Sequence, residues 1–292
     1  MNTIAPQTSP VCTLTVACQD TVGIAAATLG HLAEQGLFIT DSSHHGDPGT
    51  GLFFMRTSFR STNNQPVALD RLRTSFASIA HRFGMQWDLV EDNRKPRLMV
   101  AVSKFGHCLN DLLQNWRTGC LRVEIPAVVS NHNEFRDLVE WYGIPFHHLP
   151  ITPETKPQQE EKFLNLFSGL NCDLLVLARY MQVLSPNMCQ SLSGRAINIH
   201  HSFLPSFKGA KPYQQAHTKG VKIIGATAHY VTDDLDEGPI IEQDVERVDH
   251  TASVEDLVRT GRDIETRVLS RAVRWHVEKR VFVNGRKTVV FR

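Results

Sequence analysis

The sequence has no long apolar run, no closely paired cysteines and no excess of charge of one sign. No stretch approaches the roughly 20 apolar residues of a membrane-spanning helix. The first ten residues also lack the basic and apolar regions of a signal peptide. The six cysteines include no Cys-x-x-Cys pair, and reduced thiols are therefore expected. A net charge of +1 favours neither nucleic acid nor a membrane surface as partner, so we predict a cytoplasmic protein without either.

What is present is the composition of a globular protein, in a chain of 292 residues with 41% hydrophobic residues. This length suits one large domain or two ordinary ones. A charged segment over residues 92–97 contains a proline, and the pattern of the sequence changes after it. We therefore predict a first domain over residues 1–91, a linker over 92–97 and a second domain over 98–292.

The first domain alternates strand and helix patterns in the order β-α-β-β-α-β, the split βαβ or ferredoxin-like arrangement. Apolar periodicity predicts four strands and two helices there: strands over 11–18, 37–43, 52–59 and 86–90, and helices over 24–35 and 66–82.

The turn Asp20-x-x-Gly23-Ile24 and the strand that follows Gly36 resemble an ACT domain, a small regulatory module that often binds amino acids between subunits. The resemblance implies an amino-acid effector near Asp20, Gly23 and Ile24, together with assembly into a homo-oligomer. The alternative is that this segment serves only as an oligomerisation platform.

The second domain alternates helices with strands that are nearly continuously apolar, as in a buried parallel sheet. The predicted elements are strands over 98–103, 123–129, 146–149 and 174–178, helices over 107–116, 134–142, 155–170 and 251–279, and an exposed hairpin over 281–291. This alternation predicts an open, mainly parallel, Rossmann-like α/β sheet, whose ligands bind beyond the carboxyl ends of the strands. The polar run 158–161 is interpreted as a solvated helix face.

A candidate site lies at the end of a further short strand that begins at Ala196. Residues two apart on a strand share a face, so Asn198 and His200 project together. Asparagine offers a donor that does not titrate, and histidine titrates near neutral pH. Asp236, which follows 36 positions after His200, adds a carboxylate. Such a trio can polarise a carbonyl and move protons, as acyl transfer or hydrolysis requires.

Two segments around this trio resemble the formyltransferase-type family, which moves a formyl group to or from 10-formyltetrahydrofolate. Residues 198–209 are Asn-Ile-His-His-Ser-Phe-Leu-Pro-Ser-Phe-Lys-Gly, and residues 229–239 are His-Tyr-Val-Thr-Asp-Asp-Leu-Asp-Glu-Gly-Pro. The resemblance covers about residues 97–280, and the spacing of His200 and Asp236 is that of the family. It implies that Asn198, His200 and Asp236 are catalytic.

The resemblance also implies a binding site for the pteridine ring of the folate. One wall would be the loop after an apolar strand, and the other would be the segment that carries Asp236. The implied binding residues are Met181, Gln182, Val183, Leu184, Asp233 and Gly238. Core packing is the alternative for the first loop, and Gln182 stands where many transferases have arginine. A lysine pair, Lys208 and Lys211, is a candidate contact for the glutamate tail of the folate.

The loop after the first strand of the second domain bears on the acceptor of the formyl group. Relatives that formylate a phosphorylated glycinamide have a glycine-rich loop there, whose N–H groups hold phosphate. This chain has one glycine in that loop, and Phe105 adds bulk. His201 also stands where transferases often have proline or alanine. The resemblance therefore implies water as acceptor: hydrolysis of 10-formyltetrahydrofolate to formate and tetrahydrofolate, supplying formate for purine synthesis and balancing the one-carbon pool.

For the mechanism, our hypothesis makes Asn198 and protonated His200 the donors to the developing oxyanion, with Asp236 as the base. His229 is expected to help by orienting Asp236 or water. A metal is not expected, because the adjacent residues His200 and His201 face opposite sides of a strand. A cofactor beyond the folate substrate is not expected either, because no Gly-x-Gly-x-x-Gly motif of a nicotinamide site follows any strand. Two alternatives remain: a formyltransferase that acts on an amine, and a non-catalytic regulator that binds folate or an amino acid.

Overall fold

The structure is a computed structural model, which describes residues 10–63, 65–204 and 212–292. Part of the sequence motif lies outside these residues, namely Pro205, Ser206 and Gly209, and so does the lysine pair Lys208 and Lys211. None of the described helices combines the length and the apolar character needed to cross a membrane. All six cysteines are free thiols, and five of them are buried.

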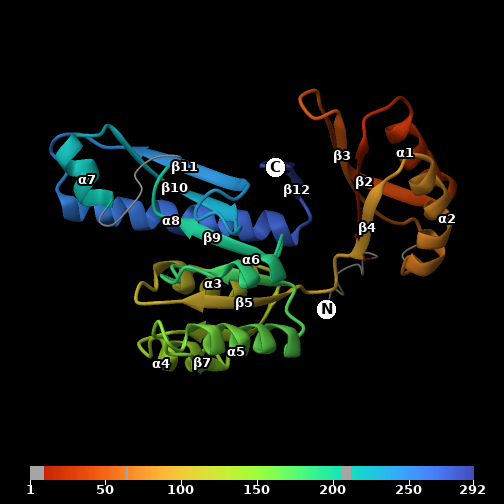
Figure 1. Cartoon of the computed structure of the whole chain (residues 1–292). Coiled ribbons are helices and arrows are strands. Elements are labelled where there is room, and N and C mark those ends of the chain that lie inside the picture. Colours follow the sequence, from red (N-terminus) through yellow and green to blue (C-terminus); the bar gives the residue numbers. More distant parts are fainter. Residues whose placement is uncertain (1–9, 64, 205–211) are drawn as a thin grey trace, which may run out of the picture. The chain divides into compact units, whose positions relative to one another are not determined.

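The described chain forms two compact units, which are treated separately below (Figure 1). The first unit takes the chain up to Lys95, together with Glu278–Asn284 and Val289–Arg292. The second unit takes Pro96–Val277 and Gly285–Thr288. The end of the chain is thus shared between the units, whereas the sequence placed all of it in the second domain.

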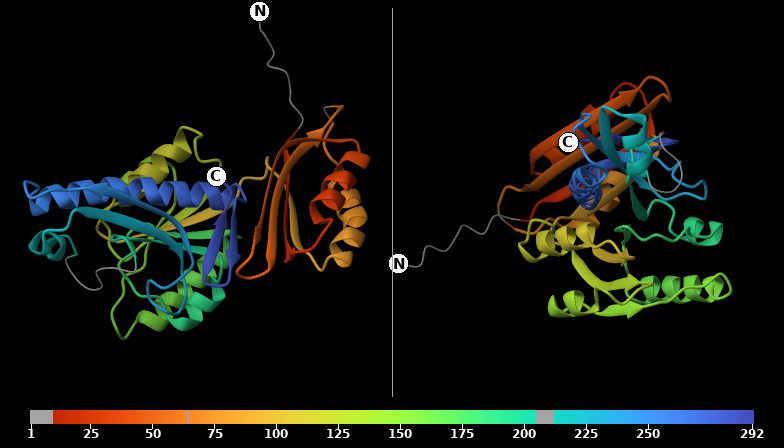
Figure 2. Two further views of the ribbon diagram at one scale, coloured as in Figure 1. Left: turned by 90° about the horizontal axis from the view of Figure 1, so that it is seen from above. Right: turned by 90° about the vertical axis from the view of Figure 1, so that its left-hand side faces the viewer.

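The first unit is the ferredoxin-like fold that the sequence predicted, with four antiparallel strands in the order β2-β3-β1-β4. Helices α1 and α2 cover one face of this sheet, as Figure 2 shows. Helix α1 ends where Gly36 adopts a φ of 72°, a left-handed conformation that favours glycine. The elements are β1 (Cys12–Gln19), α1 (Ile24–Glu34), β2 (Leu37–Asp47), β3 (Leu52–Ser61), α2 (Leu69–Arg82) and β4 (Gln86–Glu91).

The other face of this sheet is covered by the C-terminal hairpin, formed by β12 (Val281–Asn284) and β13 (Lys287–Val290). The Phe282 ring lies 5.7 Å from that of Phe54. Asn284 Nδ2 donates to Asp47 Oδ2 at 2.6 Å. The prediction of an exposed hairpin was therefore wrong, because β3 carries Phe54 on its outer face, and this large apolar side chain is buried with Phe282 beside it.

The second unit is built on a seven-stranded sheet in the order β11-β10-β9-β8-β5-β6-β7. The pairs from β9 to β7 are parallel, whereas β10 and β11 run antiparallel, which confirms the mainly parallel α/β prediction. The elements are β5 (Arg97–Val102), α3 (His107–Arg117), β6 (Glu124–Ser130), α4 (Arg136–Trp141), β7 (Phe146–His148), α5 (Lys156–Gly169), β8 (Leu174–Leu177), α6 (Pro186–Ser191), β9 (Ala196–His200), α7 (Pro212–Lys219), β10 (Ile223–Tyr230), β11 (Ile240–Arg247) and α8 (Val254–Val277).

Helices lie on both faces of this sheet (Figures 1 and 2). Phe163 and Phe167 of α5 pack against alternate residues of the central strands, such as Met99 and Leu175. Helices α3 and α8 pack against each other on the opposite face. With both faces covered, the central strands need apolar residues at every position, which is the pattern seen in the sequence.

The polar run at the start of α5 is solvated only in part, because Gln158 and Glu161 are exposed whereas Gln159 and Glu160 are buried. Gln159 is 5% exposed and donates through Nε2 to the Tyr180 hydroxyl at 3.0 Å. Glu160 is 7% exposed, and its Oε1 accepts the backbone N–H of Ser185 at 2.9 Å. Polar side chains are buried here because the loop after β8 offers unpaired backbone and hydroxyl groups to bond.

Candidate active site

The candidate site forms where β9 ends, between β8 and β10. Asn198 pairs directly with His229 across the antiparallel β9–β10 ladder, so their side chains share one face of the sheet. Asn198 Nδ2 lies 3.3 Å from His229 Nε2. His200 is the last residue of β9 and lies on that face as well, as strand alternation predicted.

Asp236 reaches these side chains from the loop between β10 and β11. Its Oδ2 lies 3.1 Å from His200 Nδ1, and its Oδ1 lies 3.6 Å from His229 Nε2. Its φ of 60° is left-handed, a conformation that is uncommon outside glycine and concentrates at functional sites. The structure therefore brings together all three residues that the sequence singled out, with His229 as the fourth.

The tautomers of the two histidines follow from their partners. His229 Nδ1 donates to the backbone oxygen of Tyr230 at 2.9 Å, so in the neutral ring Nε2 accepts from the amide of Asn198. His200 Nδ1 donates to the Asp236 carboxylate, and its Nε2 is buried without a partner among the described residues. A buried nitrogen without a partner is costly, and a ligand in the site would satisfy it.

Asp236 is held ionised by its neighbours. Burial alone raises the pKa of the Asp236 carboxyl, but its interactions with His200 and His229 outweigh burial and hold that pKa well below its usual range. The carboxylate therefore keeps its charge at neutral pH and fixes the orientation of the His200 ring.

A cavity of about 280 Å³ opens beside these side chains. Its polar wall carries the four residues above, and its other walls come from the loop after β8 and the loop that carries Asp236. Three side chains at its rim are apolar yet more than half exposed: Met181 at 52%, Val183 at 56% and Leu235 at 61%. Of the residues proposed from sequence to bind the pteridine, those that line the cavity are Met181, Gln182, Val183, Leu184 and Asp233.

Gly238 is not among the lining residues. A Cβ at this position would overlap the backbone oxygen of Tyr230, so Gly238 permits a close approach of the loop to the end of β10. In the first unit, Asp20 is exposed and Gly23 starts α1 with a φ of 96°, whereas Ile24 is buried in the core. The effector residues proposed from sequence are therefore not equally accessible.

The comparisons with known proteins agree with this geometry. A family model described as formyl transferase matches residues 96–273. A formyltetrahydrofolate deformylase from Corynebacterium sp. (strain P-1) is 50% identical over 96% of this chain and 97% of its own length. The enzyme of that name from Escherichia coli (strain K12) is 43% identical over 94% of this chain and 95% of its own. The chain belongs to the formyltetrahydrofolate deformylase family.

Solved structures support this assignment. The formyltetrahydrofolate deformylase from Burkholderia mallei has a TM-score of 0.93 and 49% identity, covering 97% of this chain and 100% of its own. A glycinamide ribonucleotide transformylase from Symbiobacterium toebii has a TM-score of 0.63 and 30% identity, covering 95% of its own chain but only 68% of this one. The deformylase family thus shares nearly the whole chain, whereas the transformylase shares about two thirds.

Two residues that the sequence-based site did not include, Ser103 and Glu160, hold the loop after β8. The backbone N–H of Met181 donates to Ser103 Oγ at 3.0 Å, and that of Ser185 donates to Glu160 at 2.9 Å. Both partners are buried polar residues. Ser103 directly follows an apolar strand, which was an available signal, whereas Glu160 lies in a polar run and gave none. In both cases the partner, 78 or 25 positions away, is visible only in the fold.

Arg179 and His201 also line the cavity, although neither was among the proposed site residues. Arg179 Nη1 lies 2.6 Å from His201 Nδ1. Burial, followed by the positive charges of Arg179 and His200, lowers the pKa of His201 to about 4. His201 is therefore neutral at physiological pH, unlike an exposed histidine near its titration midpoint.

The neutral state of His201 predicts a pH dependence of stability. Between its folded pKa of about 4 and an unfolded value of about 6.5, the unfolded chain binds the extra proton, so the free energy of unfolding rises with pH in this window. We expect urea unfolding at pH 7.5 and pH 5 to show that the free energy of unfolding falls less on acidification in His201→Gln than in the wild type. An identical loss in both proteins would contradict this expectation.

One group of described residues has the spacing of a metal site: His107, Cys108 and Glu265. Burial, followed by the charge of Glu265, raises the pKa of the Cys108 thiol, which opposes the thiolate form that metals bind. The guanidinium of Arg179 also lies 3.3 Å from the Glu265 carboxylate and repels a cation there. These residues therefore fit a network of hydrogen bonds better than a metal ion.

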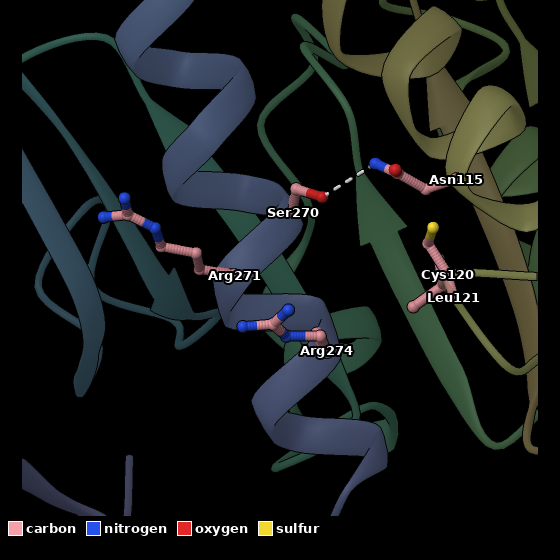
Figure 3. Close-up of a pocket in the computed structure, with 6 residues that line it drawn as sticks. All are labelled: Asn115, Cys120, Leu121, Ser270, Arg271 and Arg274. Carbon is pink, nitrogen blue, oxygen red and sulfur yellow. Dashed lines mark hydrogen bonds between the residues drawn. The ribbon is translucent and has the colours of Figure 1, made fainter.

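A second, smaller cavity of about 180 Å³ lies between α3 and α8, and Figure 3 shows its lining. Asn115 Nδ2 donates to Ser270 Oγ at 3.1 Å, and Arg271 and Arg274 of α8 also line the cavity. Arg271 already lies 3.4 Å from Asp244. The lining offers no pair of acid and base, so the chemistry belongs to the larger cavity.

Proposed function

We propose that this chain hydrolyses 10-formyltetrahydrofolate to formate and tetrahydrofolate. The observation that carries the proposal is the pairing of His200 with Asp236 at 3.1 Å, with His200 Nε2 left unpartnered beside the larger cavity. Two relatives named formyltetrahydrofolate deformylase are 50% and 43% identical to this chain, and each match covers nearly the whole length of the relative.

The reaction requires a base, an oxyanion site and an acid. A formyl group on nitrogen is an amide, which water attacks slowly at neutral pH. Attack by water gives a tetrahedral intermediate with a negatively charged oxygen, and the nitrogen needs a proton before it leaves. Donors fixed where the negative charge develops are worth about 3–4 kcal/mol each.

His200 is better suited than Asp236 to be the base. The Asp236 carboxylate has its pKa well below the usual range and already accepts from His200, so it is a weak base toward water. His200 Nε2 is free to take the proton from water, and Asp236 stabilises the imidazolium that forms. The imidazolium then returns the proton to the leaving nitrogen as the carbon–nitrogen bond breaks. This assignment replaces the sequence-based hypothesis that Asp236 acts directly on water.

Asn198 supplies a donor to the oxyanion. His229 accepts one N–H of the Asn198 amide, which fixes the side chain and leaves the second N–H for the cavity. His229 thus acts by orienting Asn198 more than by orienting Asp236, from which it is 3.6 Å away. The amide cannot titrate, so this donor is present at every pH.

The exposed apolar rim supports folate as the ligand. The side chains of Met181, Val183 and Leu235 would cover the two faces of a flat pteridine ring, and the loop backbone would bond its edge. No metal or cofactor beyond the folate has a role in this scheme. The proposal also includes a cytoplasmic location and a supply of formate for purine synthesis. It further includes assembly into a homo-oligomer and an amino-acid effector that binds the first unit.

The decisive experiment is incubation with 10-formyltetrahydrofolate alone while formate and tetrahydrofolate are measured. We expect equal amounts of both products, at a rate that does not change when a primary amine is added. Formylation of the amine without formate release would instead show a formyltransferase. Tight folate binding without turnover would show a non-catalytic regulator.

A further inference from the structure

A buried network of charged and polar side chains lies behind the larger cavity and is not used by the mechanism above. Its centre is Glu265 of α8, which is 1% exposed. Glu265 accepts from His107 Nε2 at 2.8 Å and from the Tyr213 hydroxyl at 2.8 Å. A side chain at Gly261, one turn earlier in α8, would overlap the Tyr213 ring, so this glycine admits the tyrosine. A buried carboxylate with this many donors is fixed in place.

Arg179 connects this carboxylate to the cavity. Its Nε lies 3.3 Å from Glu265 Oε2, and its side chain is only 10% exposed. Phe105 packs over the guanidinium, with 5.6 Å between Arg179 Cζ and the ring centroid. Arg179 follows β8 with a φ of 64°, a left-handed conformation that is uncommon for a residue with a side chain. An uncommon backbone conformation held by an ion pair indicates that the position of the guanidinium is specified.

The guanidinium determines the tautomer of His201. All hydrogen-bonding groups of arginine are donors, so the contact of 2.6 Å between Arg179 Nη1 and His201 Nδ1 requires Nδ1 to accept. The proton of the neutral ring is then on Nε2. The charged neighbours of this ring are Arg179, His200, Glu265 and Asp236, and the Tyr213 ring centroid lies 6.3 Å away.

His201 is also placed beside the base. Its ring stacks on that of His200 with centroids 4.9 Å apart and planes at 20°, and both residues line the cavity. Among the described residues, no hydrogen bond to Nε2 of His201 is found. We propose that Glu265 and Arg179 position His201 as a fixed, neutral Nε2–H donor that binds the oxyanion of the tetrahedral intermediate together with Asn198. This inference rests on the proposed hydrolysis.

The chemistry favours a donor at this place. The positive guanidinium at Nδ1 withdraws electron density from the ring and strengthens the hydrogen bond that Nε2–H donates to a negative oxygen. The donor is in place before the reaction, so no reorganisation is needed as charge develops. Glu265 balances the charge of Arg179, which keeps the arginine buried without an unpaired cation.

The first test is spectroscopic and does not depend on turnover. Nitrogen-15 NMR of histidine-labelled wild type, with the His201 signals assigned by their absence in His201→Gln, reports the tautomer and charge of this ring. We expect the neutral Nε2–H form throughout about pH 5 to pH 8, and a loss of this preference in Arg179→Met. A ring protonated on Nδ1, or one that titrates within this range, would overturn the proposal.

The second test is kinetic and separates a donor from a structural residue. His201→Leu removes the donor and is expected to lower kcat about 10²–10³-fold with KM largely unchanged, because the bond forms only in the transition state. His201→Gln offers an N–H at the end of its side chain and is expected to recover most of the lost rate. Wild-type kcat in His201→Leu, or no recovery by glutamine, would refute the donor role.

A matched pair of charge removals tests the positioning residues. Glu265→Gln removes the buried partner of Arg179. The control Glu246→Gln, on β11, removes an exposed carboxylate that lies 3.5 Å from Arg267, a residue of the same helix as Glu265. Only Glu265→Gln should alter the His201 NMR signals and lower kcat, and equal effects of the two changes would contradict a specific role. Should the wild type prove not to hydrolyse the folate, the proposed function fails, while the spectra still decide whether the network fixes His201.

Discussion

Asp236→Asn is expected to lower kcat for formate release by about 10²–10⁴-fold while folate still binds. The asparagine amide can donate its N–H to His200 Nδ1, the atom that lies 3.1 Å from Asp236 in the wild type. The His200 ring then carries its proton on Nε2, where it can no longer accept a proton from water. The apolar walls of the cavity are untouched, so the loss should appear in kcat and not in folate affinity.

The control for this prediction is Asp234→Asn in the same loop. Asp234 is exposed, and its backbone oxygen, which accepts from Thr232, is unchanged by the substitution. We expect kcat within about twofold of wild type, since surface substitutions away from such contacts have small effects. Single-turnover formate release measures the rate of the chemical step, and equilibrium binding measures the folate affinity separately. If Asp236→Asn released formate at the wild-type rate, the proposed His200–Asp236 mechanism would be refuted.

Gly238→Ala is expected to lower both stability and activity. A Cβ at this position would overlap the backbone oxygen of Tyr230 and lie 3.2 Å from His229 Nδ1. The loop must move away from β10, which we expect to cost about 1–3 kcal/mol of unfolding free energy. Asp236 lies two residues earlier and moves with the loop, and a displacement of about 1 Å in such a site can cost about 10²-fold in kcat.

Gly169→Ala provides the matched control for the glycine substitution. Gly169 ends α5, has no positive φ and has no atom within 4 Å of an added Cβ. Alanine favours helix over glycine by up to about 1 kcal/mol, so this variant should be as stable as wild type or slightly more so. Urea unfolding and kcat are measured on both variants, and we expect only Gly238→Ala to lose stability and activity. Equal behaviour of the two would show that the contact with Tyr230 does not restrict the loop.

Much of the fold follows from short-range patterns. The alternation in residues 12–19 and the helical spacing in 69–82 are local properties, so the order of elements in the first unit was predictable. The hairpin was predicted as exposed because its own residues do not show what they cover. Its partner, Phe54, lies more than two hundred positions earlier in the chain.

The candidate site also has features that the sequence predicted and features that only the fold revealed. Strand alternation alone placed Asn198 and His200 on one face, Asp236 was the acid that follows them in the sequence, and the resemblance to a family implied that all three are catalytic. His229 took a different role from the one expected, because the β9–β10 register brings it opposite Asn198. Gln159 and Glu160 were interpreted as solvated, since a helix with polar residues does not reveal that a loop lies over it.

By itself, the sequence determined the order of strands and helices, the pairing of Asn198 with His200 on one face, and the family. Local spacing and recognisable motifs are sufficient for these. Only the tertiary structure decided how protons are arranged in the site: which nitrogen of His200 is free, and that Glu265 acts through Arg179 to set the tautomer of His201. Hydrogen-bond partners fix a tautomer, and these partners come from distant segments that meet only when the chain folds.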